Sequence, residues 1–136
     1  MRIVLDANPL FSALLKDGPT RRTIYDTEAA LFAPEHLKAE LARHRAELQR
    51  RSGLSTAEFP RLVDEITAQI SWVIDDAVRA HVPEAARALA SVDVGDVPYL
   101  ACALAVRADA IWSHDRDFDE QRLVKRVSHP DELRRE

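Results

Sequence analysis

The chain alternates short apolar segments with longer segments of helical periodicity, and this alternation limits the fold more than any other feature. Strand-like runs lie at 2–5, 30–33, 70–74, 110–113 and 124–128, and helical patterns fill the intervals between them. Strands joined through helices run parallel, because parallel neighbours need long crossover connections. We therefore expect an α/β fold, with a parallel sheet that helices cover on both faces.

Helix boundaries follow from capping residues. Asn8, directly before Pro9, is typical of a helix start, and we expect this first helix to end near Lys16. Thr20 is expected to cap a second helix that runs through Asp26. Further helices are expected at 34–52, ended by Gly53; at 55–68, with Ser55 and Glu58 as a capping box; at 76–90; and at 97–107 after a polar loop at 91–96.

Composition indicates a globular protein. A chain of 136 residues with 46% hydrophobic residues can bury a real core, and we expect residues 1–136 to form one domain. The sequence has no basic leader ahead of an apolar segment and no apolar stretch near 18 residues, so we expect neither export nor a membrane span, and a cytoplasmic location. The one cysteine, Cys102, lies between alanines and is expected in the core.

Carboxylates follow the predicted strands. Asp6 comes directly after the strand at 2–5, and Asp115 comes just after the strand at 110–113. Asp96 precedes the helix that leads into this later strand. Because ligands bind beyond the carboxyl ends of parallel strands, we expect these acids to gather at one edge of the sheet. Glu40 joins them if its helix crosses that edge, since it flanks the apolar stripe of its helix.

Two of these acids also have a structural explanation as caps. Asp6 could begin a turn ahead of the first helix, but Asn8 already offers the cap, so a functional role for Asp6 is favoured. Asp93 and Asp96 both precede a helix, and one cap is enough. Asp96 is nearer the helix and is the preferred ligand, whereas Asp93 is the expected cap and stays an alternative ligand.

The remaining polar candidates divide by position. Glu40 is balanced between a role in the site and an exposed pair with Arg43 or His44. Asp115 is favoured over Asp117 because it is nearer the strand end. Asp119 and Glu120 are expected to be solvated side chains in the first turn of a short helix. His114 is expected to be a surface neighbour of the acids or a substrate contact.

An acidic cluster without thiolates or grouped imidazoles indicates a particular metal chemistry. Carboxylate oxygens are the ligands that Mg²⁺ and Mn²⁺ prefer. Two such ions about 4 Å apart can activate a water and stabilise a phosphodiester during hydrolysis. A cation would also offset the repulsion among the acids. The residues therefore point to metal-dependent hydrolysis of phosphodiester bonds.

Four segments together resemble the motifs of PIN-domain proteins, the fold of many toxin–antitoxin ribonucleases. They are IVLDANPLFSALLKDGPTR, the helix that bears Glu40, DVGDVPYLACALA and IWSHDRDF. The resemblance implies a five-stranded parallel sheet in a three-layer α/β/α fold. It also implies Mg²⁺- or Mn²⁺-dependent cleavage of RNA, an antitoxin protein as a partner, and pairing as a homodimer.

The resemblance also assigns roles to individual residues. Asp6, Glu40, Asp96 and Asp115 would be the catalytic acids. The metal ligands would be Asp6, Asp96 and Asp115, with Asp117 as a secondary acid. Asn8 and Ser113 match small polar positions beside the first and fourth acids, where they would orient carboxylates through hydrogen bonds.

Two other classes of protein compete with the nuclease. A phosphoaspartate receiver domain needs adjacent acids near the first strand and a lysine after the last long strand, but the chain has DAN and SHDRD at these places. A catalytically idle PIN-like module that binds RNA or a protein would keep the same acids. Metal-dependent RNA cleavage that is lost in Asp6→Asn separates the enzyme from the binding module.

Overall fold

A computed structural model describes residues 1–90 and 93–135 of the chain. Its centre is a sheet of five parallel strands in the order β3-β2-β1-β4-β5. The strands are β1 (Arg2–Leu5), β2 (Ala30–Pro34), β3 (Ile70–Val73), β4 (Ala110–Trp112) and β5 (Arg126–Val127). The strand order changes direction at β1, where β2 lies on one side and β4 on the other. Such a switch point is where open α/β sheets bind ligands.

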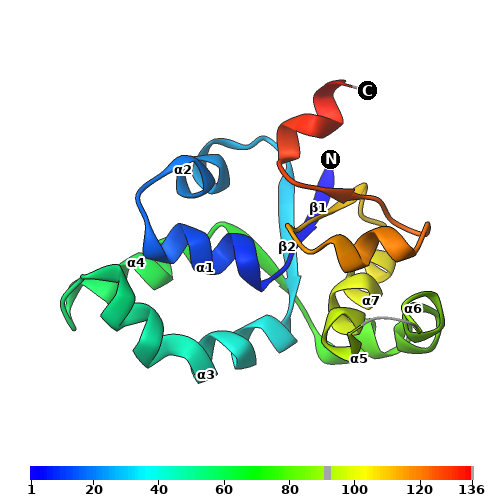
Figure 1. Ribbon diagram of the computed structural model, residues 1–136, viewed down its shortest axis with the longest axis horizontal. Helices are drawn as coiled ribbons and strands as arrows, with labels where there is room; N and C mark the ends of the chain where they lie inside the picture. The colour runs from blue at the N-terminus through cyan, green and yellow to red at the C-terminus, as the bar shows by residue number, and fades with distance from the viewer. Residues whose placement is uncertain (91–92, 136) are drawn as a thin grey trace.

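Helices cover both faces of this sheet (Figure 1). The α-helices are α1 (Ala7–Leu15), α2 (Pro19–Asp26), α3 (Glu35–Ser52), α4 (Glu58–Thr67), α5 (Asp75–Arg79), α6 (Val82–Ala88) and α7 (Val97–Ala105). Helix α1 packs on α2, α3 and α4, while α7 packs on α5 and α6 and on the central strands. The expected three-layer α/β/α architecture is therefore confirmed. Among the described residues, no helix has both the length and the apolar character needed to cross a membrane.

The core lies on both sides of the central strands. Ile3, Val4 and Leu5 of β1 are fully buried, because helices cover this strand from both faces. On the face covered by α7, this helix contributes a run of buried residues, whose small side chains let the helix approach the sheet closely. Cys102 is one of these, fully buried as expected, and burial raises the pKa of its thiol to about 12.

Two expected helix boundaries were wrong, and proline explains both. Helix α2 begins at Pro19 with Gly18 as its N-cap, so Thr20 lies inside the helix. A proline at the first helical position has no N–H to leave unpaired and already holds a helical φ. The single helix expected at 76–90 is instead α5 and α6. Pro83 cannot donate to the carbonyl of Arg79, so a continuous helix would be broken there.

Other boundaries agree more closely. Gly53 ends α3 in a left-handed conformation with a φ of 74°. Ser55 and Glu58 form the expected capping box, with reciprocal hydrogen bonds of 3.0 and 3.1 Å. Of the expected loop at 91–96, residues 91–92 lie outside the described part, and the 3₁₀ helix η1 spans Val94–Asp96.

The last expected strand, at 124–128, is shorter in the structure. The Gln121 side chain accepts hydrogen bonds from the backbone N–H groups of Leu123 and Val124, which holds this segment as a turn. Only Arg126–Val127 then pairs with β4. The strand expected at 70–74 is also shorter and ends at Val73. Helix α5 begins two residues later, at Asp75.

Candidate metal centre

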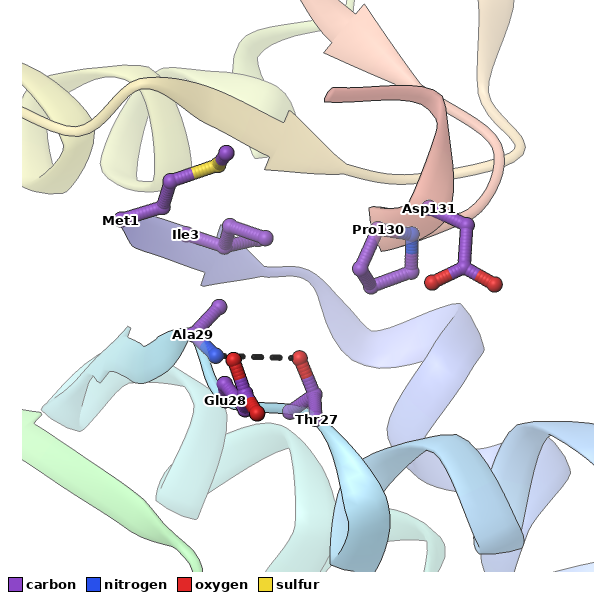
Figure 2. Close-up of a pocket in the computed structure, with 7 residues that line it drawn as sticks. All are labelled: Met1, Ile3, Thr27, Glu28, Ala29, Pro130 and Asp131. Carbon is purple, nitrogen blue, oxygen red and sulfur yellow. Dashed lines mark hydrogen bonds between the residues drawn. The ribbon is translucent and has the colours of Figure 1, made fainter. Parts of the chain in front are cut away.

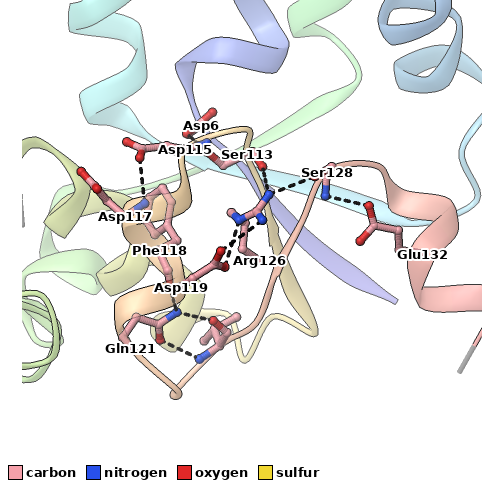
Figure 3. A network of polar contacts seen from close by, with 11 residues as sticks. Asp6, Ser113, Asp115, Asp117, Phe118, Asp119, Gln121, Arg126, Ser128 and Glu132 are labelled. Atoms are coloured by element: carbon pink, nitrogen blue, oxygen red, sulfur yellow. Dashed lines mark hydrogen bonds and ion pairs between the residues drawn. The ribbon is translucent and has the colours of Figure 1, made fainter.

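Asp6 and Ser113 meet at the carboxyl edge of the two central strands. Leu5 of β1 is in register with Trp112 of β4, and the Asp6 N–H donates to the Trp112 carbonyl at 3.2 Å. The fully buried Ser113 hydroxyl donates to Asp6 Oδ2 and accepts from the Asp115 N–H at 2.9 Å. One buried hydroxyl therefore joins two of the predicted acids (Figure 3).

The first helix is capped by Asp6 itself. Asp6 Oδ1 accepts from the Asn8 N–H at 3.1 Å, and the Asn8 side chain is exposed. The expectation that Asn8 caps this helix was wrong, and its contact with the carboxylate is made by its backbone. Asp6 is therefore the residue that caps α1. A functional role for Asp6 is indicated by the acids around it, and not by the presence of another cap.

Asp93 and Asp96 have different environments. Asp93 Oδ1 accepts from the Gly95 N–H at 2.8 Å and caps η1, as expected. Asp96 ends η1, is 9% exposed and makes no capping hydrogen bond to α7. In the described part of the chain, its Oδ2 is the one buried side-chain oxygen or nitrogen without a hydrogen-bond partner. A buried carboxylate oxygen in this state is costly unless a cation binds it.

Asp96 belongs to a cluster of three carboxylates. Asp96, Asp115 and Asp117 each offer an oxygen, and these oxygens lie within 4.8 Å of one another. Asp115 Oδ1 also accepts from the Asp117 N–H at 2.9 Å, which fixes the start of the 3₁₀ helix η2 (Arg116–Glu120). A set of hard oxygen donors with one buried member unsatisfied fits a divalent cation such as Mg²⁺ or Mn²⁺. This cluster could therefore hold one metal ion.

Burial and mutual repulsion raise the pKa of two acids. Burial raises the pKa of Asp96 to about 7, and the charges of Asp115, Asp93 and Asp117 add to the effect. Burial likewise raises the pKa of Asp6 to about 6, while its hydrogen bond from Ser113 opposes the change. Both shifts mean that the ionised acids lack compensating positive charge, which a bound cation would supply.

Glu40 extends from α3 toward the same acids. Its Oε1 accepts from the Tyr99 hydroxyl at 2.8 Å and lies 2.8 Å from His36 Nε2. Burial and the charge of Glu40 together raise the pKa of Tyr99 above its usual value, so the hydroxyl stays a donor. The alternative pairing of Glu40 with Arg43 or His44 is not what the structure contains.

These side chains line one hollow of about 180 Å³, which leaves room for a hydrated cation. It lies at the carboxyl edge of β1 and β4. The predicted residues that line it are Asp6, Asn8, Glu40, Asp93, Asp96 and Asp115. Asp117 belongs to the three-carboxylate cluster, and Ser113 lies beneath it, bonded to Asp6. The structure thus brings together the acids that the sequence placed at strand ends.

An arginine lies beside the acidic turn and binds it (Figure 3). Arg126 binds both oxygens of Asp119, at 3.0 and 3.2 Å, and donates to the Ser113 carbonyl at 3.1 Å. Asp119 is exposed and lies in the first turn of η2, as expected, and it also pairs with Arg126. Glu120 and His114 are exposed, as expected.

Sequence reasoning missed Tyr99, His36 and Arg126. His36 was detectable, because it lies four residues before Glu40 on the same helix and such pairs are neighbours. Tyr99 and Arg126 reach the site only through tertiary packing, and no local pattern marks them.

A different hollow lies at the opposite, amino-terminal edge of the sheet (Figure 2). Met1, Ile3 and Pro130 form much of its wall, and the Thr27 hydroxyl accepts from the Ala29 N–H at 3.2 Å. Its two acids, Glu28 and Asp131, are exposed. This hollow lacks the clustered, buried carboxylates of the carboxyl edge, and we assign it no metal chemistry.

Replacing Ser113 by alanine should destabilise the protein by about 1–3 kcal/mol at pH 8, because the buried Asp6 and the half-buried Asp115 each lose a hydrogen bond. At pH 5 the loss should be smaller, since Asp6, with a pKa of about 6, is then largely protonated and needs less stabilisation of its charge. Urea unfolding of both proteins at the two pH values measures this. Ser71→Ala, at an exposed serine in β3, is the matched control. Equal losses at both pH values would contradict the role given to the hydroxyl.

A family model described as PIN domain matches residues 4–126. No curated protein matches the chain at a significant level. The match runs from β1 to β5 and includes every acid of the hollow.

Proposed function

The chain belongs to the PIN-domain family, whose members are typically nucleases, and on this basis we propose that it is an Mg²⁺- or Mn²⁺-dependent ribonuclease. The observation that carries the proposal is the cluster of Asp96, Asp115 and Asp117, in which the buried Asp96 has an unpartnered oxygen, Oδ2. A cation would offset the repulsion among these carboxylates. When bound, such an ion lowers the pKa of a water and offsets the charge that develops on a phosphodiester.

Each acid has a proposed role. Asp96, Asp115 and Asp117 hold a cation, and Asp6 adds a fourth carboxylate that Ser113 fixes in place. Asp6, Glu40, Asp96 and Asp115 together form the catalytic set.

Glu40 differs from the others because protein donors already bind one of its oxygens. Tyr99 and His36 both contact Oε1, so Oε2 is the oxygen that remains to accept a proton or a hydrogen bond from a water. No side-chain nucleophile is required for hydrolysis at this site.

The test is cleavage of a panel of substrates by the purified chain. We expect total RNA and transfer RNA to be cleaved with Mn²⁺ or Mg²⁺, single-stranded DNA to be cleaved more slowly, and EDTA to stop cleavage. Binding of RNA without cleavage under every metal condition would instead identify the catalytically idle PIN-like module. Faster cleavage of DNA than of RNA would overturn the assigned substrate while leaving a nuclease.

The partners follow from the same proposal. We infer that the chain acts in the cytoplasm on RNA, as a homodimer, with an antitoxin protein as its inhibitor. Light scattering of the purified chain tests the dimer. Co-expression with the products of neighbouring genes, followed by the cleavage assay, tests inhibition by a partner.

A further inference from the structure

A second hollow lies beside the acidic one at the carboxyl edge of the sheet. It opens where β2 ends and α5 begins, and it holds about 240 Å³. Its walls are mainly apolar, with Pro34 from β2, Val78 and Val82 from α5 and α6, and Pro98 from α7. Its polar residues are few: His36, Asp75 and Arg79. A hollow with apolar walls and a few polar groups suits an organic ring better than a cation.

The two hollows are joined through residues that hold Glu40. His36 lines the second hollow, and its Nε2 lies 2.8 Å from Glu40 Oε1 in the first. Pro98 lines the second hollow directly before Tyr99, whose hydroxyl binds the same Glu40 oxygen. The two sites therefore share a wall.

Sheet geometry sets the distance between them. The acidic hollow lies over the ends of β1 and β4, and the second lies over the ends of β2 and β3. Neighbouring strands are about 4.8 Å apart, so the two centres are separated by roughly two strand spacings, or about 10 Å. A phosphate held at the acids would place the base of an adjoining nucleotide within reach of the second hollow.

The walls suit the faces of a base. Nucleobases are flat, with apolar faces and polar edges, and proteins that read single strands stack them on aromatic or apolar side chains. The His36 ring, which packs edge-on against Tyr99 at 5.8 Å, offers such a surface beside Pro34 and Pro98. The carboxylate of Asp75 disfavours a phosphate in the same place.

The polar residues of α5 suit one base in particular. Asp75 and Arg79 are four residues apart on α5, both are exposed, and both line the hollow. An ionised Asp only accepts hydrogen bonds, and an Arg only donates them. Guanine presents two adjacent donors, N1–H and the N2 amino group, next to the O6 and N7 acceptors that arginine binds. In the structure, Arg79 forms an ion pair with Asp76 at 3.3 Å. Both side chains are exposed, so replacing this ion pair by contacts with a base costs little free energy.

We propose that this second hollow binds a guanine base adjoining the phosphate that is cleaved, with Asp75 and Arg79 reading its edge. The proposal rests on the function given above, because it places the phosphate at the acids. It assigns this nuclease a sequence preference that the acids themselves do not supply.

The first test is cleavage of an RNA pool that is random around the cut, with Mn²⁺ and the full chain. The wild type should favour guanine at one position flanking the cut by about tenfold, the discrimination expected of one well-placed pair of hydrogen bonds. Asp75→Asn should slow cleavage at guanine-flanked sites and so remove most of this preference. Asp76→Asn, which removes the same charge from the next residue of α5, is the matched control and should keep the preference.

A second test does not depend on cleavage. Guanosine monophosphate, titrated into the protein, should shift the methyl resonances of Val78 and Val82, and cytidine monophosphate should not. Asp75→Asn should weaken this binding about tenfold.

The outcomes separate the inference from the proposed function. Cleavage without any base preference, or a preference that Asp75→Asn leaves intact, overturns the guanine site while the nuclease stands. Selective binding of guanosine monophosphate by a protein that cleaves nothing supports the guanine site while the nuclease fails. Neither cleavage nor selective binding overturns both.

Discussion

Asp96→Asn should lower metal-dependent RNA cleavage on the order of a thousandfold while leaving the fold intact. The substitution keeps the side-chain volume and removes the charge of the one buried carboxylate oxygen that the described structure leaves unpartnered. Asp115→Asn, in the same cluster, and Asp6→Asn, bonded through Ser113, should have effects of similar size. Initial rates with a fluorescent RNA in Mn²⁺ measure the loss, and circular dichroism checks the fold.

The controls separate metal binding from a general effect of charge. Asp64→Asn removes one exposed acid of α4, on the other face of the sheet from α7, and should leave the rate unchanged. Asp93→Asn removes a charge near Asp96 but keeps an oxygen that can accept from the Gly95 N–H, and it should lower the rate only moderately. A fully active Asp96→Asn combined with an inactive Asp93→Asn would transfer the ligand role to Asp93 and contradict the assignment made from burial.

The sequence predicted the sheet well because buried parallel strands are continuous apolar runs between helices. Residues 2–5 and 110–113 are runs of this kind, and they contain the central strands β1 and β4. The edge strand β5 was predicted too long, since the Gln121 side chain, rather than β4, takes the backbone donors of Leu123 and Val124. Side-chain competition of this kind leaves no periodic signal.

The site was predictable in its acids but not in what holds them. Strand ends and parallel topology suffice to bring Asp6 near Asp115, whichever residue caps the helix. The Asn8 prediction failed because Asp6 and Asn8 are both good caps, and only the backbone path decides between them. The contacts of Tyr99 with Glu40 and of Arg126 with Asp119 join residues from separate elements, so local sequence cannot reveal them.

The same electrostatics predict how the metal-free protein responds to pH. The pKa values of Asp6 and Asp96 are raised to about 6 and about 7 in the folded protein, above the ordinary value of 3.8. Between about pH 4 and 7 the folded chain therefore binds more protons than the unfolded chain, and its stability falls as the pH rises. In EDTA, the protein should melt at a higher temperature at pH 5.5 than at pH 7.5, and Asp96→Asn should reduce this difference.

Manganese should reverse that loss of stability at pH 7.5. An ion that binds only the folded state stabilises it by RT ln(1 + [L]/Kd), or about 2.7 kcal/mol at a hundredfold excess over Kd, so the wild type should melt several degrees higher in millimolar Mn²⁺ than in EDTA. Asp96→Asn and Asp115→Asn should gain much less, because each removes one of the clustered carboxylates. In EDTA the same variants should melt at or above the wild type, since neutralising one acid relieves repulsion among the others.

Melting curves of the three proteins in EDTA and in Mn²⁺ test this even if no substrate is found, and Asp64→Asn should follow the wild type in both. A wild type indifferent to Mn²⁺, together with variants that melt lower than it in EDTA, would mean that these carboxylates act as caps and hydrogen-bond acceptors. The buried Asp96 oxygen would then need another partner, and the nuclease assignment would lose its physical basis.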